Sequence, residues 1–212
     1  MSTVKPAAPI LLYRHPISGH AHRVELFLSL LGLPATLIDV DLAAGTHKQP
    51  AFLAKNIFAQ IPVIEDGNVT LSDSNAILVY LATKYGDESW LPRTPEGAAQ
   101  VQRFLSIAAG DIAFGVAAAR VANIFGAPFD HATVQARAHR LLAIFDQLLA
   151  QSPYLTGQRP SIADVACYSY LSHAPEAGIA LDAYPQVLAW IARIEALPGF
   201  VPMCVTRVGL AA

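Results

Sequence analysis

Ser18 is the side chain of this 212-residue sequence that is best placed to do chemistry. It follows a short apolar run at residues 10–13 and precedes a segment in which Ala21, Val24 and Leu28 recur at helical spacing. A serine at such a point lies at a helix N-terminus, where free backbone N–H groups and the helix dipole favour an anion. Its hydroxyl can donate a hydrogen bond to that anion, or it can serve as an ordinary N-cap. The two roles are compatible, so both stay open.

A second group of polar residues precedes another predicted helix. Asp73 and Ser74 stand at its start, where a side-chain oxygen and free N–H groups converge on one spot that suits a charged group of a ligand. Upstream, Pro62 pushes Ile61 into an extended conformation. A cis bond between them would turn the chain sharply and present the backbone of Ile61 to a peptide, whereas a trans bond would make Pro62 a plain strand opener.

Metal and cysteine chemistry are disfavoured. His15, His20 and His22 share no helical-face spacing with a fourth ligand, so we assign no metal and expect polar loop or surface groups. Cys167 and Cys204 lie far apart and outside any CxxC pair, which argues against a disulfide scaffold, a zinc site and a dithiol redox centre.

The elements that must position these residues alternate between strand and helix in the first 85 residues. Asp66-Gly67-Asn68 between two apolar runs is a strong hairpin signal, and Gly86 is expected to end a helix in the left-handed conformation. The predicted elements are strands at 10–13, 36–42, 62–65 and 69–71 and helices at about 20–31, 50–55 and 74–85. The order βαβ then ββα is that of a thioredoxin-like α/β domain.

No strand pattern recurs beyond residue 95. Thr94-Pro95-Glu96 opens a helical stretch that runs to Gly126, and further helices are predicted over about 132–150 and 185–197. Ser161 and Asp164 form a capping-box pattern, which we interpret as structural. We therefore expect a thioredoxin-like domain at 1–85 with a flexible tail at 1–9, a linker at 86–95 and an all-helical domain at 96–212.

Composition limits the partners. Hydrophobic residues make up 54% of the chain and charged residues 14%, which suggests that some apolar surface meets a partner subunit. A net charge of -2 offers no attraction for nucleic acid or anionic lipid, so we discount both. We expect neither a secretory signal nor a membrane anchor, and a reducing cytoplasm fits the two cysteines.

Through three segments, in this order and spacing, the sequence resembles the cytosolic glutathione S-transferase superfamily. The resemblance is to its serine-type, theta-like members, as found in bacteria. The similarity extends from Leu12 to about Phe200. The segments are Ser18-Gly19-His20-Ala21-His22-Arg23-Val24, then Gln60-Ile61-Pro62-Val63 with Leu71-Ser72-Asp73-Ser74-Asn75-Ala76-Ile77, and finally Ser161-Ile162-Ala163-Asp164. The resemblance implies a homodimer that uses glutathione as co-substrate and holds no permanent cofactor.

For Ser18, the resemblance implies a catalytic hydroxyl that stabilises the thiolate of bound glutathione. A free thiol ionises near pH ~8.5, and a charge-assisted hydrogen bond of roughly 1.5–3 kcal/mol would lower that pKa by about one to two units. Tyr13 is the rival hydroxyl, because other classes use a tyrosine late in the first strand, although an inward core role suits its position better.

The resemblance also implies the glutathione contacts. The backbone of Ile61, before a cis Pro62, would bind the cysteinyl unit, Asp73 would meet the γ-glutamyl ammonium, and Ser74 would meet its carboxylate. Asp73 can at the same time be an N-cap. Three further implied contacts, which could equally be solvated loop residues, are His47 and Lys48 for the glycyl carboxylate and Gln60.

Two expectations concern surfaces beyond glutathione. The second substrate would meet one face of the helix after residue 95. The alternatives are that this face is part of the core or a dimer contact. The residues of the face are Phe104, Ile107, Asp111, Phe114 and Ala118. Phe58 lies where some classes insert an aromatic key into the partner subunit, and a contact within its own domain is the alternative.

The leading functional hypothesis is a glutathione transferase in which the bound thiolate attacks a hydrophobic electrophile. Dehalogenation, peroxide reduction and isomerisation by the same thiolate stay open. The alternative is a non-catalytic glutathione-binding or scaffold protein of the same fold. A thiol-disulfide oxidoreductase is disfavoured, because the loop around Ser18 contains no cysteine.

Overall fold

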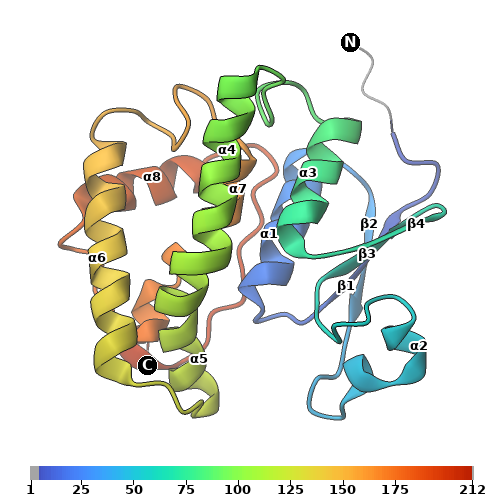
Figure 1. Ribbon diagram of the computed structural model, residues 1–212, viewed down its shortest axis with the longest axis horizontal. Coiled ribbons are helices and arrows are strands. Elements are labelled where there is room, and N and C mark those ends of the chain that lie inside the picture. The colour runs from blue at the N-terminus through green and yellow to red at the C-terminus, as the bar shows by residue number, and fades with distance from the viewer. Residues whose placement is uncertain (1–4, 212) are drawn as a thin grey trace.

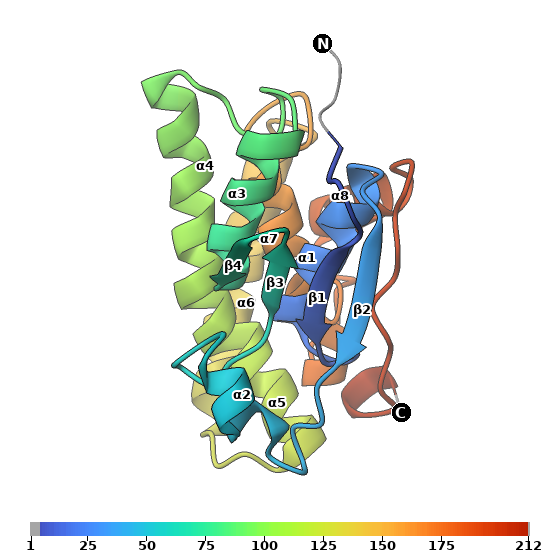
Figure 2. The same ribbon diagram turned by 90° about the vertical axis from the view of Figure 1, so that its right-hand side faces the viewer.

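A four-stranded sheet forms the framework of the first part of the chain in the computed structural model, which describes residues 5–211. Strand β1 (Ile10–Arg14) pairs in parallel with β2 (Ala35–Asp39). Strand β3 (Val63–Asp66) runs antiparallel between β1 and β4 (Val69–Ser72). The resulting order β2-β1-β3-β4 is visible in Figure 2, and it is the thioredoxin-like arrangement that the sequence predicted.

Three α-helices complete this part: α1 (Gly19–Leu30), the short α2 (Pro50–Leu53), and α3 (Ser74–Tyr85). A 3-10 turn (Thr46–Lys48) leads into α2. Figure 1 shows α1 and α3 between the sheet and the C-terminal helices, with α2 set apart from both. Two helix N-termini, those of α1 and α3, are therefore brought to the same side of the sheet.

Gly86 does not have the left-handed conformation that the sequence predicted, since its φ is −83°. A Cβ atom at this position would lie 2.8 Å from the carbonyl oxygen of Ala82, so the absence of a side chain permits a close approach instead of an unusual φ.

The second part is all helical, as expected. A π-helix (Ala108–Ala117) joins two of its α-helices into one continuous helical stretch, and short 3-10 helices lie at Ala174–Ala177 and Gly209–Ala211. The α-helices are α4 (Pro95–Ile107), α5 (Ala118–Phe125), α6 (His131–Leu149), α7 (Ile162–Leu171) and α8 (Pro185–Glu195).

Helix α7 is the centre of the molecule, because every one of its residues is buried. It packs against α1 and α3 on one side and against α4 on another, so a single core joins the two parts of the chain. Its first turn contains a capping box: the Asp164 carboxylate accepts from the amide of Ser161 at 2.9 Å, and Ser161 Oγ accepts from the amide of Ala163 at 3.3 Å. The Asp164 carboxylate also accepts from the indole of Trp190 at 2.9 Å, which fastens α8 to α7.

The helical stretch Pro95–Phe125 is the one segment within residues 5–211 that is long and apolar enough to cross a membrane by length and composition. Fifty-six per cent of its most apolar window is buried in the fold, and the stretch packs against α6 and α7. It is a core helix of the helical part.

Candidate functional site

A cavity of about 340 Å³ lies where the N-termini of α1 and α3 approach the loops around α2 and before β3. This volume is at the lower end of the range of small-molecule sites. Six of the eight predicted glutathione residues line it, and Ser18 and Lys48 do not. The full lining is His20, Leu42, His47, Ala59, Gln60, Ile61, Pro62, Asp73 and Ser74.

The wall before β3 is formed by Gln60, Ile61 and Pro62, and the Ile61–Pro62 bond is cis. Asn56 fixes this loop by donating from its amide to the carbonyl oxygen of Gln60 at 2.8 Å. The residue before Gln60, Ala59, has a φ of 53°. The wall is thus a defined backbone surface.

Backbone strain is concentrated at the cavity. Within residues 5–211, two non-glycine residues have positive φ angles, Ala59 at 53° and Asp73 at 70°, and both line the cavity. Such conformations cost on the order of 1–3 kcal/mol each and persist where function or surrounding structure requires them. The strain supports a binding role for this surface.

The N-terminus of α3 offers an anion site with a buried cation behind it. Asp73 caps the helix by accepting from the amide of Ala76 at 2.9 Å. Fully buried Arg23 donates to Ser74 Oγ at 3.3 Å and to the amide oxygen of Asn75 at 2.8 Å. Its Nε and Nη2 have no partner among the described residues, and burial lowers the pKa of this guanidinium. The positive potential around Ser74 favours a carboxylate.

His20 lines the cavity, although the sequence placed it among the loop or surface groups. Its Nδ1 lies 3.4 Å from Ser74 Oγ, and its ring packs edge-on against Tyr170 with centroids 5.1 Å apart. Burial, with repulsion from Arg23, lowers the pKa of His20 to about 3. The imidazole is therefore neutral near pH 7 and forms a polar wall without charge.

His22 is also buried, which corrects the same expectation. Its Nδ1 lies 2.8 Å from Ser169 Oγ on α7, and its Nε2 lies 2.9 Å from the carbonyl oxygen of Val201. This histidine joins α1 to the helical part, and it has no part in the cavity. The spacing of residues in α1 gave no sign of this, because the covering residues come from far along the chain.

Ser18 is the N-cap of α1, and its Oγ accepts from the amide of Ala21 at 3.3 Å. It is half-buried and stands two residues before His20, next to the cavity but outside its lining. Within residues 5–211, the Ala21 amide is the sole hydrogen-bond partner of Ser18 Oγ, so the hydroxyl proton is free to be donated.

Tyr13 is engaged elsewhere. Its hydroxyl donates to Glu65 at 3.0 Å, its ring packs edge-on against Phe52, and Lys55 lies over the ring face. Lys55 pairs with the same Glu65 carboxylate. Tyr13 does not line the cavity, and its position matches the inward role that the sequence favoured for it.

Of the pair expected at the glycyl end, only His47 reaches the cavity lining. Its Nδ1 is buried and has no hydrogen-bond partner among the described residues, so it is available to a bound group. Lys48 is the next residue in the same 3-10 turn, and its side chain is not part of the lining.

The expected second-substrate face is not formed, which corrects that prediction. Phe104 is completely buried against Phe145, and Ala118 is buried too. Phe114 is 61% exposed, and it lines a separate hollow beside α6 together with Asp111. Ile107 packs against the core. Spacings of three and four define one face only in an α-helix, and the π-helix from residue 108 onward has more residues per turn.

Comparison with known proteins gives one answer for both parts of the chain. The glutathione S-transferase N-terminal domain matches residues 8–83, and the glutathione S-transferase C-terminal domain matches residues 130–198. Glutathione S-transferase 3 of Zea mays is 36% identical over 209 residues, covering 91% of this chain and 92% of that protein. Glutathione S-transferase theta-2B of Homo sapiens is 30% identical, covering 89% and 81%. The crystal structure of a glutathione S-transferase from Pseudomonas fluorescens superimposes with a TM-score of 0.87 at 32% identity, covering 93% and 100%. A chain that shares both domains, the sheet order and most of its length with these proteins belongs to the glutathione S-transferase superfamily and is a glutathione transferase.

Proposed function

We propose that Ser18 holds the sulfur of bound glutathione as a thiolate, which then attacks a hydrophobic electrophile. The observation that carries this proposal is the free hydroxyl proton of Ser18 at the N-terminus of α1, beside a cavity lined by the predicted glutathione residues. A thiolate at this point gains both a donated hydrogen bond and the favourable end of the helix dipole.

Each end of the tripeptide has a counterpart in the cavity. Asp73 meets the γ-glutamyl ammonium, while Ser74, with the cation of Arg23 behind it, meets the α-carboxylate. The backbone of Ile61 pairs with the cysteinyl unit. His47 faces the glycyl carboxylate, and Gln60 adds a polar contact on the same wall.

The chemistry needs no nucleophile from the protein. The thiol proton is released to solvent, the sulfur forms a bond to the electrophilic carbon, and the leaving group departs with the electron pair of the bond that breaks. The Ser18 hydrogen bond is worth roughly 1.5–3 kcal/mol, which corresponds to about one to two units in the pKa of the bound thiol.

The test compares Ser18→Ala with Tyr13→Phe, since each variant removes one of the two candidate hydroxyls. The pKa of the bound thiol is followed by the ultraviolet absorbance of the thiolate, and turnover is followed with an aryl halide. We expect Ser18→Ala to raise the thiol pKa by about one to two units and to lower kcat at least tenfold. We expect Tyr13→Phe to leave both unchanged.

Two outcomes would contradict the proposal. A normal thiol pKa and normal turnover in Ser18→Ala would exclude the serine mechanism. Glutathione binding by the wild-type protein without turnover of any electrophile would indicate a binding protein instead.

We also propose a cytoplasmic homodimer, as is typical of the family. Ile57 and Phe58 are 81% and 75% exposed, so no contact within residues 5–211 buries Phe58. Two adjacent apolar side chains at the tip of a loop are suited to insertion into a partner subunit. Sedimentation of the wild type as a dimer, and of Phe58→Ser as a monomer at the same concentration, is the expected result. A monomeric wild type would refute it.

A further inference from the structure

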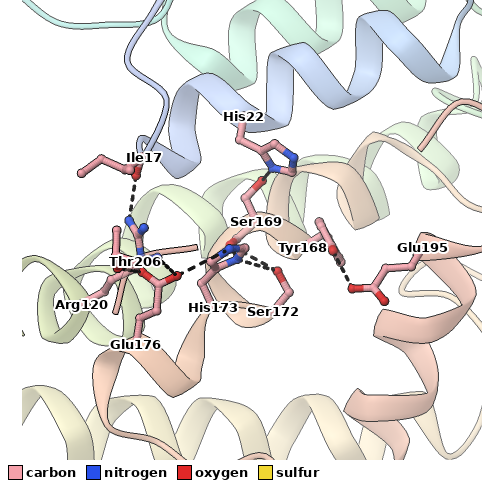
Figure 3. A network of polar contacts seen from close by, with 10 residues as sticks. All are labelled: Ile17, His22, Arg120, Tyr168, Ser169, Ser172, His173, Glu176, Glu195 and Thr206. Atoms are coloured by element: carbon pink, nitrogen blue, oxygen red, sulfur yellow. Dashed lines mark hydrogen bonds and ion pairs between the residues drawn. The ribbon is translucent and has the colours of Figure 1, made fainter. Parts of the chain in front are cut away.

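The loop that presents Ser18 is held by a side chain from the other half of the molecule. Nη1 of Arg120, on α5, donates to the carbonyl oxygen of Ile17 at 2.8 Å, across 103 positions of sequence. Ile17 is the residue immediately before Ser18. Figure 3 shows the guanidinium of Arg120 directed at this carbonyl.

Two hydrogen bonds, this one and one from the Ser18 N–H, hold the peptide plane between Ile17 and Ser18 from both sides. The Ile17 carbonyl and the Ser18 N–H belong to the same planar group. The carbonyl accepts from Arg120, and the N–H donates to the carbonyl oxygen of His15 at 2.9 Å. The carbonyl oxygen of Ser18 accepts from the amide of His22 at 2.8 Å, so the peptide planes on both sides of Ser18 Cα are held and the direction of its side chain is fixed.

Arg120 is itself fixed by a buried ion pair. Its Nε donates to Glu176 Oε2 at 2.8 Å, and the side chains of Arg120 and Glu176 are 3% and 2% exposed. The C-terminal segment closes over this pair, since both the amide and the hydroxyl of Thr206 donate to the Glu176 carboxylate. Figure 3 shows a continuous line of contacts from Thr206 through Glu176 and Arg120 to Ile17.

A guanidinium suits this position because it has donors on separate nitrogens. Nε is directed at the carboxylate and Nη1 at the carbonyl, so a single rigid group sets the distance between Glu176 and Ile17. A lysine ammonium is a single point on a flexible stem and does not reproduce that fork.

We infer that Arg120 is a positioning residue for the reaction, which holds Ser18 through the Ile17 carbonyl at the orientation that its hydroxyl needs to reach the glutathione sulfur. Glu176 and Thr206 hold Arg120 in turn, so the C-terminal segment contributes to the activation of a thiol bound in the first domain. This inference rests on the proposed role of Ser18.

The test uses Arg120→Lys in the full-length protein, with the same measurements of bound-thiol pKa, kcat and KM. We expect a rise in thiol pKa of about half that seen in Ser18→Ala, a fall in kcat of about three- to tenfold, and little change in KM for glutathione. Arg120→Met with Glu176→Gln is the second variant. It removes both charges together and so leaves no unpaired buried charge to unfold the protein.

Ser169→Ala is the matched control. It removes the contact of Ser169 with His22, which is equally buried and also joins α1 to the helical part, but which does not touch the Ser18 loop. We expect it to lower the melting temperature and to leave the thiol pKa unchanged. An equal rise of the thiol pKa in this control would overturn the inference, because any loosening between the two parts would then suffice.

A double-mutant cycle separates this inference from the proposed function. If Arg120 acts through Ser18, Arg120→Lys changes the thiol pKa in the wild type but not in Ser18→Ala. An effect of equal size in both backgrounds, or no effect in the wild type while Ser18→Ala raises the pKa, would overturn the role of Arg120 alone. A normal thiol pKa in Ser18→Ala would overturn both.

Discussion

Replacement of His22 with glutamine should make the stability of this protein less sensitive to acid. Burial is the main cause that lowers the pKa of His22, with repulsion from His173, Arg14 and Arg23 adding to it, and the pKa lies at about 4 against an ordinary value of 6.5. Between these two values the unfolded chain binds a proton that the folded protein does not bind. Stability contributed by the neutral imidazole is therefore present above pH 6.5 and is lost as the pH falls toward 4.

The magnitude follows from the two pKa values. Between about pH 7.5 and about pH 5, the His22 contribution to the free energy of unfolding should fall by about 2 kcal/mol. Urea unfolding at both pH values measures this loss, and the loss should be about 2 kcal/mol smaller in His22→Gln than in the wild type. The exposed His131 supplies a control, because His131→Gln should leave the wild-type difference intact. An identical loss in the wild type and His22→Gln would refute the reasoning.

Three further predictions concern single contacts. Asp164→Asn should lower the free energy of unfolding by about 2–4 kcal/mol, because an amide NH₂ would face donors such as the indole of Trp190. KM for glutathione should not change; urea unfolding measures the first effect and steady-state kinetics the second. Gly19→Ala should lower the free energy of unfolding by about 1–3 kcal/mol, since its Cβ would lie 2.7 Å from the Tyr170 ring. Addition of Tyr170→Leu to this variant should recover part of the lost stability, as measured by a thermal melt. Asp73→Asn keeps a capping oxygen and tolerates the positive φ, so KM for glutathione should rise roughly tenfold with an unchanged melting temperature; a normal KM would exclude a charge contact with the ammonium.

Local sequence signals predicted the framework well. Apolar runs of strand length, the Asp66-Gly67-Asn68 turn and the capping residues of α3 and α4 each act within a few positions, so their physics is readable from the chain. The helix expected over 74–85 is α3 as observed. The resemblance to a family supplied what local patterns do not contain, namely which residues would meet a peptide at Pro62 and Asp73.

The misplaced histidines and the missed Arg120 contact have a common physical cause, which is that the groups in contact come from distant positions in the sequence. His20 and His22 look like polar residues of an exposed first turn until α7 is placed over them. Arg120 and Ile17 are 103 positions apart, and nothing near either of them signals the contact. The second-substrate face failed for another reason, because a spacing argument assumes a regular helix and residues 108–117 do not form one.

That π-helical stretch has a further consequence. Its ten residues, between α4 and α5, set the rotation of α5 about the helix axis relative to α4. A residue of an α-helix turns the chain by about 100°, whereas a π-helical residue turns it by less, so the direction of the α5 side chains depends on how much of this stretch is π-helical. Conversion of all ten residues to a regular α-helix would therefore change the direction of Arg120, although its own sequence neighbourhood is untouched. Changes in the length of this segment are thus expected to alter the contact between Arg120 and the Ile17 carbonyl, although the segment is remote from Ile17 in the sequence.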